Sequence, residues 1–179
     1  MDKALHIYRE LLERWRKAMD LVGPGSVNPH FEDSQKAVAK LPVSGRWADL
    51  GSGAGFPGVV LAAAFPEAQV ELVERRQKRA TFLETVVAAA GLKNAQVRCV
   101  DSAELPAGAY DGLISRAYKP PAELLPEGQR LLRPGGYLAL MLATEEAPEA
   151  PGYTLFHVER YTVEGKARKV VVLRKREEG

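Results

Sequence analysis

The sequence predicts an α/β fold: a mostly parallel sheet with helices on both faces and an antiparallel hairpin at one edge. Two observations favour this class. From Arg46 onward, strand-like runs alternate with helix-like runs, as in proteins with parallel sheets. The last two strand-like runs are joined by the short turn Glu164-Gly165, so they must run antiparallel. The 179 residues, 46% of them hydrophobic, are enough for one domain with a proper core.

The first 40 or so residues have a different pattern from the rest. Residues 2–19 repeat apolar side chains at helical spacing, and the breakers Gly23-Pro24-Gly25 and Asn28-Pro29 follow. A short second helix is expected over residues 33–41, capped by Asp33 or Ser34. The sequence therefore predicts that residues 1–42 form an N-terminal helical extension and that residues 43–179 form the main domain.

The alternating region supplies seven strands. Parallel strands are expected over residues 46–50, 69–74, 95–100, 110–115 and 136–142. The helices between them are expected over residues 57–65, 76–90 and 121–132. The C-terminal hairpin is expected to pair residues 153–161 with residues 167–175.

The composition argues against several kinds of site. One cysteine, Cys99, permits no internal disulfide, and with three scattered histidines it supplies no metal-ligand spacing. A net charge of +2 does not by itself require a nucleic-acid partner. The chain begins without an apolar run and nowhere has 18 consecutive apolar residues, so we expect no signal peptide and no membrane span. We therefore expect a cytoplasmic protein without a metal, in which Cys99 is a buried strand residue.

The segment from Asp49 to Gly58 is the most informative part of the chain. It holds Gly51, Gly53, Gly55 and Gly58 between a strand-like run and a helix-like run. Glycines let a ligand approach the backbone closely, and a strand, a glycine turn and a helix N-terminus together form a nucleotide-sized site. The spacing also satisfies G-x-G-x-x-G, but that motif alone is a weak signal for a dinucleotide.

Three neighbouring features favour a different ligand. Asp49 would repel a pyrophosphate and attract a cationic sulfonium or ammonium group. Pro57 removes a backbone donor that a phosphate would use, and the chain offers no second mononucleotide-binding half. A nucleoside with a positive centre and no phosphate fits best, which is S-adenosylmethionine. A nicotinamide-dependent dehydrogenase is the weakest alternative.

Two carboxylates follow the next strands at the edge where such sheets bind ligands. Glu74 ends the second strand, where it can accept hydrogen bonds from both ribose hydroxyls, and Asp101 ends the third, where it could accept from the adenine amino group. The structural alternatives are a solvated strand end for Glu74 and a helix or turn cap for Asp101.

These residues belong to motifs that resemble the bacterial small-subunit ribosomal RNA methyltransferase G family, also called glucose-inhibited division protein B. The resemblance lies in the segments Asp49–Gly58, Leu72–Leu83, Leu92–Asn94 and Ser115–Ala117. Trp15–Asp20, His30–Ser34 and the Leu132–Gly136 turn add to it, so that it covers roughly residues 5–140.

The resemblance implies a Rossmann-like class I methyltransferase fold. The activity it implies is methyl transfer from S-adenosylmethionine to guanine N7 in 16S rRNA, with the small (30S) ribosomal subunit or its precursor as partner and a monomeric, cytoplasmic enzyme. The cofactor site it implies comprises Asp49, Gly51, Ser52, Gly53, Gly55, Phe56, Gly58, Glu74, Arg75, Asp101, Ser102, Ala103, Glu104 and Arg116.

The sequence departs from the family pattern at three places. Ser102 replaces an arginine, Leu142-Ala143 replaces Lys-Gly, and Asp20 replaces an asparagine. Two cationic positions expected near the RNA are thereby lost. Two alternatives follow: a methyltransferase with a small-molecule or protein acceptor, and a non-catalytic relative that binds ribosome or RNA.

Methyl transfer to guanine N7 needs no general base, because N7 carries a lone pair and no proton. We expect Arg116, at the end of the fourth strand, to position the substrate through guanine O6 or a phosphate. The alternative is a surface arginine paired with Asp111 or Glu123. His30 could order the loop over the cofactor, or it could be a structural histidine.

The basic residues are spread along the chain in two groups. One comprises Arg9, Arg14, Arg16, Lys17, Lys36 and Lys40, and the other Arg168, Lys169, Arg174, Lys175 and Arg176. The residues expected to contact RNA are Arg14, Lys17, Lys36 and Lys119. For all of them the alternative is a solvated face, and RNA contact would make affinity fall steeply with salt.

Overall fold

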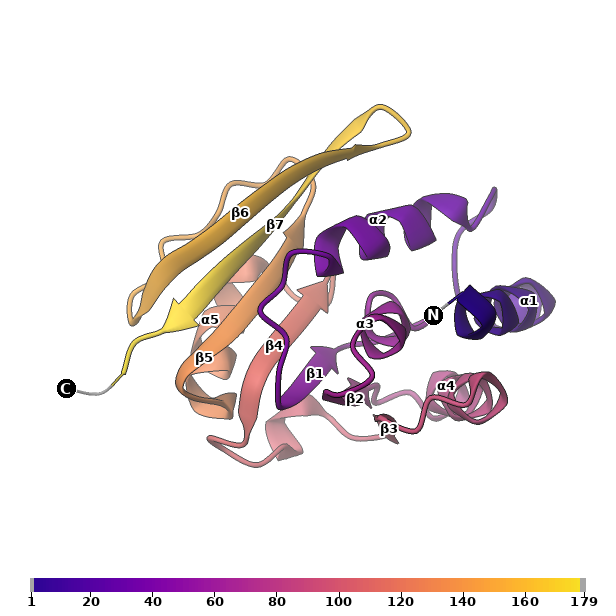
Figure 1. Ribbon diagram of the computed structural model, residues 1–179, viewed down its shortest axis with the longest axis horizontal. Helices are drawn as coiled ribbons and strands as arrows, with labels where there is room; N and C mark the ends of the chain where they lie inside the picture. Colours follow the sequence, from indigo (N-terminus) through magenta and orange to yellow (C-terminus); the bar gives the residue numbers. More distant parts are fainter. Residues whose placement is uncertain (1, 178–179) are drawn as a thin grey trace.

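A single seven-stranded sheet organises the chain, in the order β3-β2-β1-β4-β5-β7-β6 (Figure 1). The computed structural model describes residues 2–177. The strands are β1 (Arg46–Leu50), β2 (Gln69–Val73), β3 (Ala95–Arg98), β4 (Tyr110–Arg116), β5 (Leu132–Leu142), β6 (Tyr153–Val163) and β7 (Lys166–Lys175). Strands β1 to β5 pair in parallel, whereas β7 lies antiparallel between β5 and β6. The predicted sheet with its C-terminal hairpin is confirmed.

Helices cover both faces of the sheet. The helices are α1 (Asp2–Met19), α2 (Asn28–Val38), α3 (Gly58–Ala64), α4 (Gln77–Ala90) and α5 (Pro121–Leu131), with a 3₁₀ turn η1 (Ser102–Glu104). The first four helices share one hydrophobic core against the sheet, and α5 seals a second core on the opposite face. The strand order reverses between β1 and β4, which is where a parallel sheet opens a crevice for a ligand.

The N-terminal helices pack directly on the glycine segment. The ring of Tyr8 lies 5.2 Å from those of Phe31 and Phe56, so α1, α2 and the segment before α3 meet in one aromatic cluster. The Tyr8 hydroxyl donates a 2.6 Å hydrogen bond to the backbone oxygen of Ala54. Helix α1 also packs along α4. The boundary between residues 42 and 43 stays a prediction.

Helix α2 begins at Asn28, so the predicted start at residue 33 was wrong. Pro29 was taken as a breaker, but it lies in the first turn, where its missing N–H costs the helix no bond. The expected caps, Asp33 and Ser34, are instead buried within the helix. Asp33 contacts Arg116 at the end of β4 and Tyr161 on β6, and it is therefore part of the site described below.

Cys99 is exposed, and the prediction of a buried strand residue was wrong. Strand β3 ends at Arg98 rather than at residue 100, and it is the edge of the sheet. Cys99 therefore falls in the connection after the strand. In the described part of the chain, every helix is too short or too polar to cross a bilayer.

Candidate active site

The glycine segment joins the end of β1 to the start of α3. Gly51 has a φ of +71°, and its N–H donates to the backbone oxygen of Val73 at 3.0 Å. At Gly55, φ is +104° and a Cβ would lie 2.7 Å from the Tyr8 hydroxyl oxygen. Both positions exclude an ordinary side chain, because of the backbone conformation and the close neighbours. The tight turn therefore needs glycine for its shape, whatever it binds.

Asp49 lies fully buried beneath this turn. Its Oδ2 accepts a 2.9 Å hydrogen bond from the N–H of Gly58, the first residue of α3. Its Oδ1 has no hydrogen-bond partner among residues 2–177. Burial raises the pKa of Asp49 to about 6, against the lowering effect of hydrogen bonds from Ser52 and Gly58. A nearby cation would favour the ionised form of this carboxyl.

Glu74 follows β2 and faces the same turn. Its Oε2 accepts from the N–H of Gly53 and its Oε1 from the N–H of Arg76, both at 3.0 Å. The side chain is almost fully buried, so these bonds fix its orientation. It borders a cavity of about 520 Å³ lined by Gly51, Val73, Glu74, Arg75, Arg76, Arg79, Val100, Asp101, Ala117, Tyr118 and Lys119.

Four of the predicted cofactor residues thus meet in this cavity, which we call the cofactor cavity: Gly51, Glu74, Arg75 and Asp101. The other loop residues expected at the site, Asp49, Ser52, Gly53, Gly55, Phe56 and Gly58, form the turn beside it without lining it. Asp101 also caps η1: its Oδ1 accepts from the N–H of Ala103, and the backbone N–H of Asp101 donates to Oε2 of Glu104, both at 2.9 Å. Ala103 and Glu104 are exposed at this turn and do not line the cavity.

Tyr118 lines the cofactor cavity, although it was not selected as a site residue from the sequence. Its ring covers Gly51 so closely that a Cβ there would lie 2.4 Å from it. Its hydroxyl lies 3.2 Å from the hydroxyl of Ser102, the residue that replaces an arginine of the family pattern. Its position just after the end of β4, two residues past Arg116, is a signal that could have found it, since ligands bind beyond the carboxyl ends of strands.

A second cavity, of about 370 Å³, lies beside the first and shares Ala117 with it. We call it the acceptor cavity. Its lining residues are Pro29, His30, Asp33, Arg116, Ala117, Met141, Leu142, Ala143, Glu145, Val163 and Arg168. The two hollows therefore meet at the end of β4, with Arg116 on the second one.

Arg116 is held by α2 and not by either expected partner. Its Nη1 lies 3.6 Å from Oδ2 of Asp33, whereas Asp111 pairs with Arg133 at 2.9 Å. Tyr161 on β6 donates a 2.6 Å hydrogen bond to Oδ1 of the same aspartate. The guanidinium thus lies at the junction of helix α2, strand β4 and the hairpin.

His30 lies on the other side of Arg116. Its Nδ1 is 3.4 Å from Nη1 of Arg116, and because a guanidinium can only donate, Nδ1 acts as the acceptor. Burial and the positive charge of Arg116 lower the pKa of His30, so the neutral ring carries its proton on Nε2. The ring stacks on Phe56 at 5.4 Å between centroids. His30 thus connects the glycine turn to the acceptor cavity.

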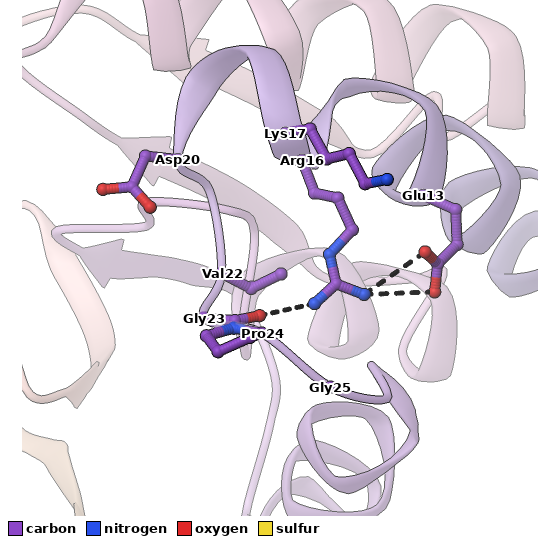
Figure 2. Close-up of a pocket in the computed structure, with 8 residues that line it drawn as sticks. All are labelled: Glu13, Arg16, Lys17, Asp20, Val22, Gly23, Pro24 and Gly25. Carbon is purple, nitrogen blue, oxygen red and sulfur yellow. Dashed lines mark hydrogen bonds and ion pairs between the residues drawn. The ribbon is translucent and has the colours of Figure 1, made fainter.

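The four residues expected to contact RNA do not gather at one place. Lys119 pairs with Glu127 at 3.0 Å, and Lys36 bonds Glu32 at 2.7 Å and the backbone oxygen of Thr162 at 2.8 Å. Arg14 and Lys17 are exposed on α1. Figure 2 shows the hollow beside Lys17, where Arg16 bonds Glu13 and the backbone of Gly23.

Comparison with known proteins places the chain in a family. The family model for rRNA small subunit methyltransferase G, also named GidB, matches residues 1–174. The chain belongs to this family. The ribosomal RNA small subunit methyltransferase G of Stenotrophomonas maltophilia is 38% identical over 169 residues, covering 89% of this chain and 79% of that protein. The Xanthomonas oryzae protein of the same name is 37% identical over 180 residues, covering 94% and 84%.

Solved structures agree on the fold. A S-adenosylmethionine-dependent methyltransferase from Aquifex aeolicus superposes with a TM-score of 0.65 at 20% identity, covering 90% of this chain and 97% of that one. The expectation of a S-adenosylmethionine-dependent rRNA methyltransferase with a Rossmann-like fold is therefore confirmed at the level of the family.

Proposed function

We propose that this member of the GidB family transfers a methyl group from S-adenosylmethionine to N7 of a guanine in 16S rRNA of the small ribosomal subunit. The observation that carries this proposal is the pair of cavities that meet at Ala117, one bordered by Glu74 and Asp101 and the other by Arg116. Their shared wall is where a donor methyl and an acceptor atom would approach each other. That the acceptor is ribosomal RNA is inferred from the names of the relatives, which are ribosomal RNA small subunit methyltransferases.

The residues of the cofactor cavity fit S-adenosylmethionine. Glu74 offers two carboxylate oxygens to ribose hydroxyls, and Asp101 offers one to the adenine amino group. The buried carboxyl of Asp49 gives the site a negative charge, which suits a ligand with a sulfonium and an ammonium group and opposes a pyrophosphate. S-adenosylmethionine supplies the electrophilic methyl group.

The chain's own residues act by positioning. Arg116 holds guanine through O6 or a phosphate, and the neutral His30, which lines the same cavity, keeps the N–H of Nε2 as a donor. Guanine becomes cationic as N7 is methylated, so an isolated arginine beside it would raise the barrier. Asp33, 3.6 Å from Arg116, offsets that charge. Arg116 can therefore orient the base without opposing the charge that develops on it.

The direct test is methylation of 30S subunits whose 16S rRNA lacks the guanine N7 methyl group. Incubation with labelled S-adenosylmethionine is expected to place label at one guanine, and borohydride and aniline treatment, which cleaves RNA at 7-methylguanosine, locates it. Naked 16S rRNA, run in parallel, decides which form is the substrate. Labelled RNA without cleavage would contradict transfer to N7, and no labelled RNA would contradict the proposal as a whole.

One observation favours a second candidate acceptor. Met141, Leu142 and Ala143 give the acceptor cavity an apolar wall where the family pattern has Lys-Gly. An apolar wall suits a small molecule or a protein side chain better than a phosphate. Label that appears only in a non-RNA acceptor, in an extract treated in the same way, would support this candidate. The monomeric state and the cytoplasmic location proposed here are tested by light scattering and fractionation.

A further inference from the structure

The β6–β7 hairpin extends beyond the end of β5. The last pair between β5 and β7 joins Leu142 to Lys169, so residues 166–168 of β7 pair with β6 alone. Figure 1 shows the hairpin projecting past its neighbours in the sheet, above α2. An angle lies between this projecting part of the hairpin and the residues that follow β5, Ala143 and Thr144.

A groove of about 510 Å³ occupies this angle, and we call it the hairpin groove. It is lined by Ala143, Thr144, Arg160, Tyr161, Thr162, Ala167, Arg168 and Lys169. Two of these residues, Ala143 and Arg168, also line the acceptor cavity. The groove therefore lies next to the acceptor cavity, on its hairpin side.

The groove gathers three cations, Arg160, Arg168 and Lys169, within one stretch of the hairpin. Arg160 faces Lys169 across the two strands, so both side chains lie on one face of the hairpin, and Arg168 lies on the other, toward the acceptor cavity. Among residues 2–177, none of the three forms an ion pair within 4.0 Å. Arg16 and Lys119, in contrast, are paired with Glu13 and Glu127.

In the part of the chain that the structure describes, no acidic residue lines the groove, and Glu145 and Asp33 lie next to it in the lining of the acceptor cavity. Glu145 accepts a 2.6 Å hydrogen bond from the N–H of Ala143, and its pKa is lowered chiefly by backbone hydrogen bonds and less by Lys169 and Arg168. The carboxylate is thus held by the backbone after β5. It offsets one of the three positive charges, so the groove keeps a positive excess.

We propose that the hairpin groove binds the phosphodiester backbone of the RNA beside the nucleotide that enters the acceptor cavity. This rests on the proposed function. Arg160 and Lys169 contact phosphates, and Arg168 stands where the strand turns into the acceptor cavity. Because phosphate contacts position the RNA without reading its bases, the groove fixes the strand while Arg116 selects the target.

The hydrogen bond from Tyr161 to Asp33 links the two places. Tyr161 lines the groove, Asp33 lines the acceptor cavity, and Asp33 also holds Arg116. The groove is thereby fixed in position relative to the guanidinium. A strand bound in the groove therefore lies next to an acceptor cavity that the same aspartate helps to build.

The test is the double variant Arg160→Gln/Lys169→Gln, with Lys3→Gln/Lys93→Gln as a control of equal charge change at exposed positions away from the groove. Binding to 30S subunits and to naked 16S rRNA is measured over a series of salt concentrations. Each phosphate contact to a single strand contributes about 0.7 to the salt slope. The groove variant is therefore expected to lower the slope by about 1.4 and kcat/KM for RNA by 10-fold or more, and the control to change neither.

Cofactor binding separates this inference from the function on which it rests. Both variants are expected to bind S-adenosylmethionine within twofold of the parent chain and to keep its circular dichroism and Tm. A parent chain that methylates RNA, with a groove variant of unchanged slope and kcat/KM, would overturn the groove alone. An equal loss in the control would also overturn it, because net charge would then suffice. A parent chain that neither binds nor methylates RNA would overturn both proposals.

Discussion

Replacing Asp49 by asparagine is expected to change the free energy of unfolding more favourably at neutral than at acidic pH. The buried carboxyl has a pKa of about 6 in the folded chain, against an ordinary value of 3.8. Between these two values the unfolded chain has released a proton that the folded chain retains. Ionisation of Asp49 therefore destabilises the fold progressively as pH rises through this window, and the effect is complete above about pH 6.

The magnitude follows from the shift. Each pKa unit corresponds to about 1.4 kcal/mol, so the charged carboxyl costs about 3 kcal/mol at pH 7.5 and about 1 kcal/mol at pH 4.5. Asparagine keeps the acceptor for the N–H of Gly58 but places an amide group where Oδ1 has no partner among residues 2–177, at a cost of about 1–3 kcal/mol. That cost is the same at both pH values and cancels in the comparison.

Urea unfolding at pH 7.5 and pH 4.5 measures the effect. The difference in unfolding free energy, Asp49→Asn minus parent, is expected to be about 2 kcal/mol more favourable at the higher pH. A change below about 0.5 kcal/mol would refute the reasoning, since that is near the error of such measurements. The infrared band of a protonated carboxyl, titrating near pH 6 in the parent and absent from the variant, provides an independent check.

Three further predictions concern the site. Glu74→Gln is expected to weaken S-adenosylmethionine binding by about 10- to 100-fold in calorimetry, because hydrogen bonds to a charged group contribute about 1.5–3 kcal/mol; binding within twofold of the parent would remove Glu74 from the cofactor site. Arg116→Lys is expected to lower kcat/KM for RNA by about 10- to 100-fold, because an ammonium cannot bind bidentately; unchanged steady-state kinetics would argue for a structural arginine. Tyr8→Phe is expected to lower the unfolding free energy by about 1–3 kcal/mol in urea, because the buried backbone oxygen of Ala54 loses its donor, and an unchanged midpoint with unchanged slope would contradict this.

The positions of β1, β2 and β4 and the glycine turn were predictable because each depends on local sequence, whereas β5 begins at Leu132, within the segment expected to be a turn before residue 136. The periodicity of β1, β2 and β4 and the glycines between Asp49 and Gly58 carry their information within a few residues. The start of helix α2 was predicted five residues too late, because the pair Asn28-Pro29 can either interrupt a helix or form its first turn. In the structure these residues are helical, and Phe31 packs against Tyr8 and Phe56. These contacts join distant parts of the chain, so no local sequence pattern predicts them.

The contact partners of the site residues were harder to predict from the sequence than the site residues themselves. Arg116 could be selected from its place at the end of β4, but its partner Asp33 is far away in the sequence and was expected to be a helix cap. Tyr161, which completes the group, comes from the edge strand of the hairpin. Contacts of this kind depend on how α2 crosses the sheet, and a single sequence carries no signal for that crossing.

The insertion of β7 between β5 and β6 also sets an order for synthesis. Everything that lines the cofactor cavity precedes residue 120, and domains generally begin to fold from the N-terminal side as they emerge. The acceptor cavity needs Val163 and Arg168, and β5 keeps an unpaired edge until residues 166–175 arrive. A nascent chain can therefore build the cofactor cavity while it is still being translated, but it completes the acceptor cavity only after β7 has left the ribosome that makes it.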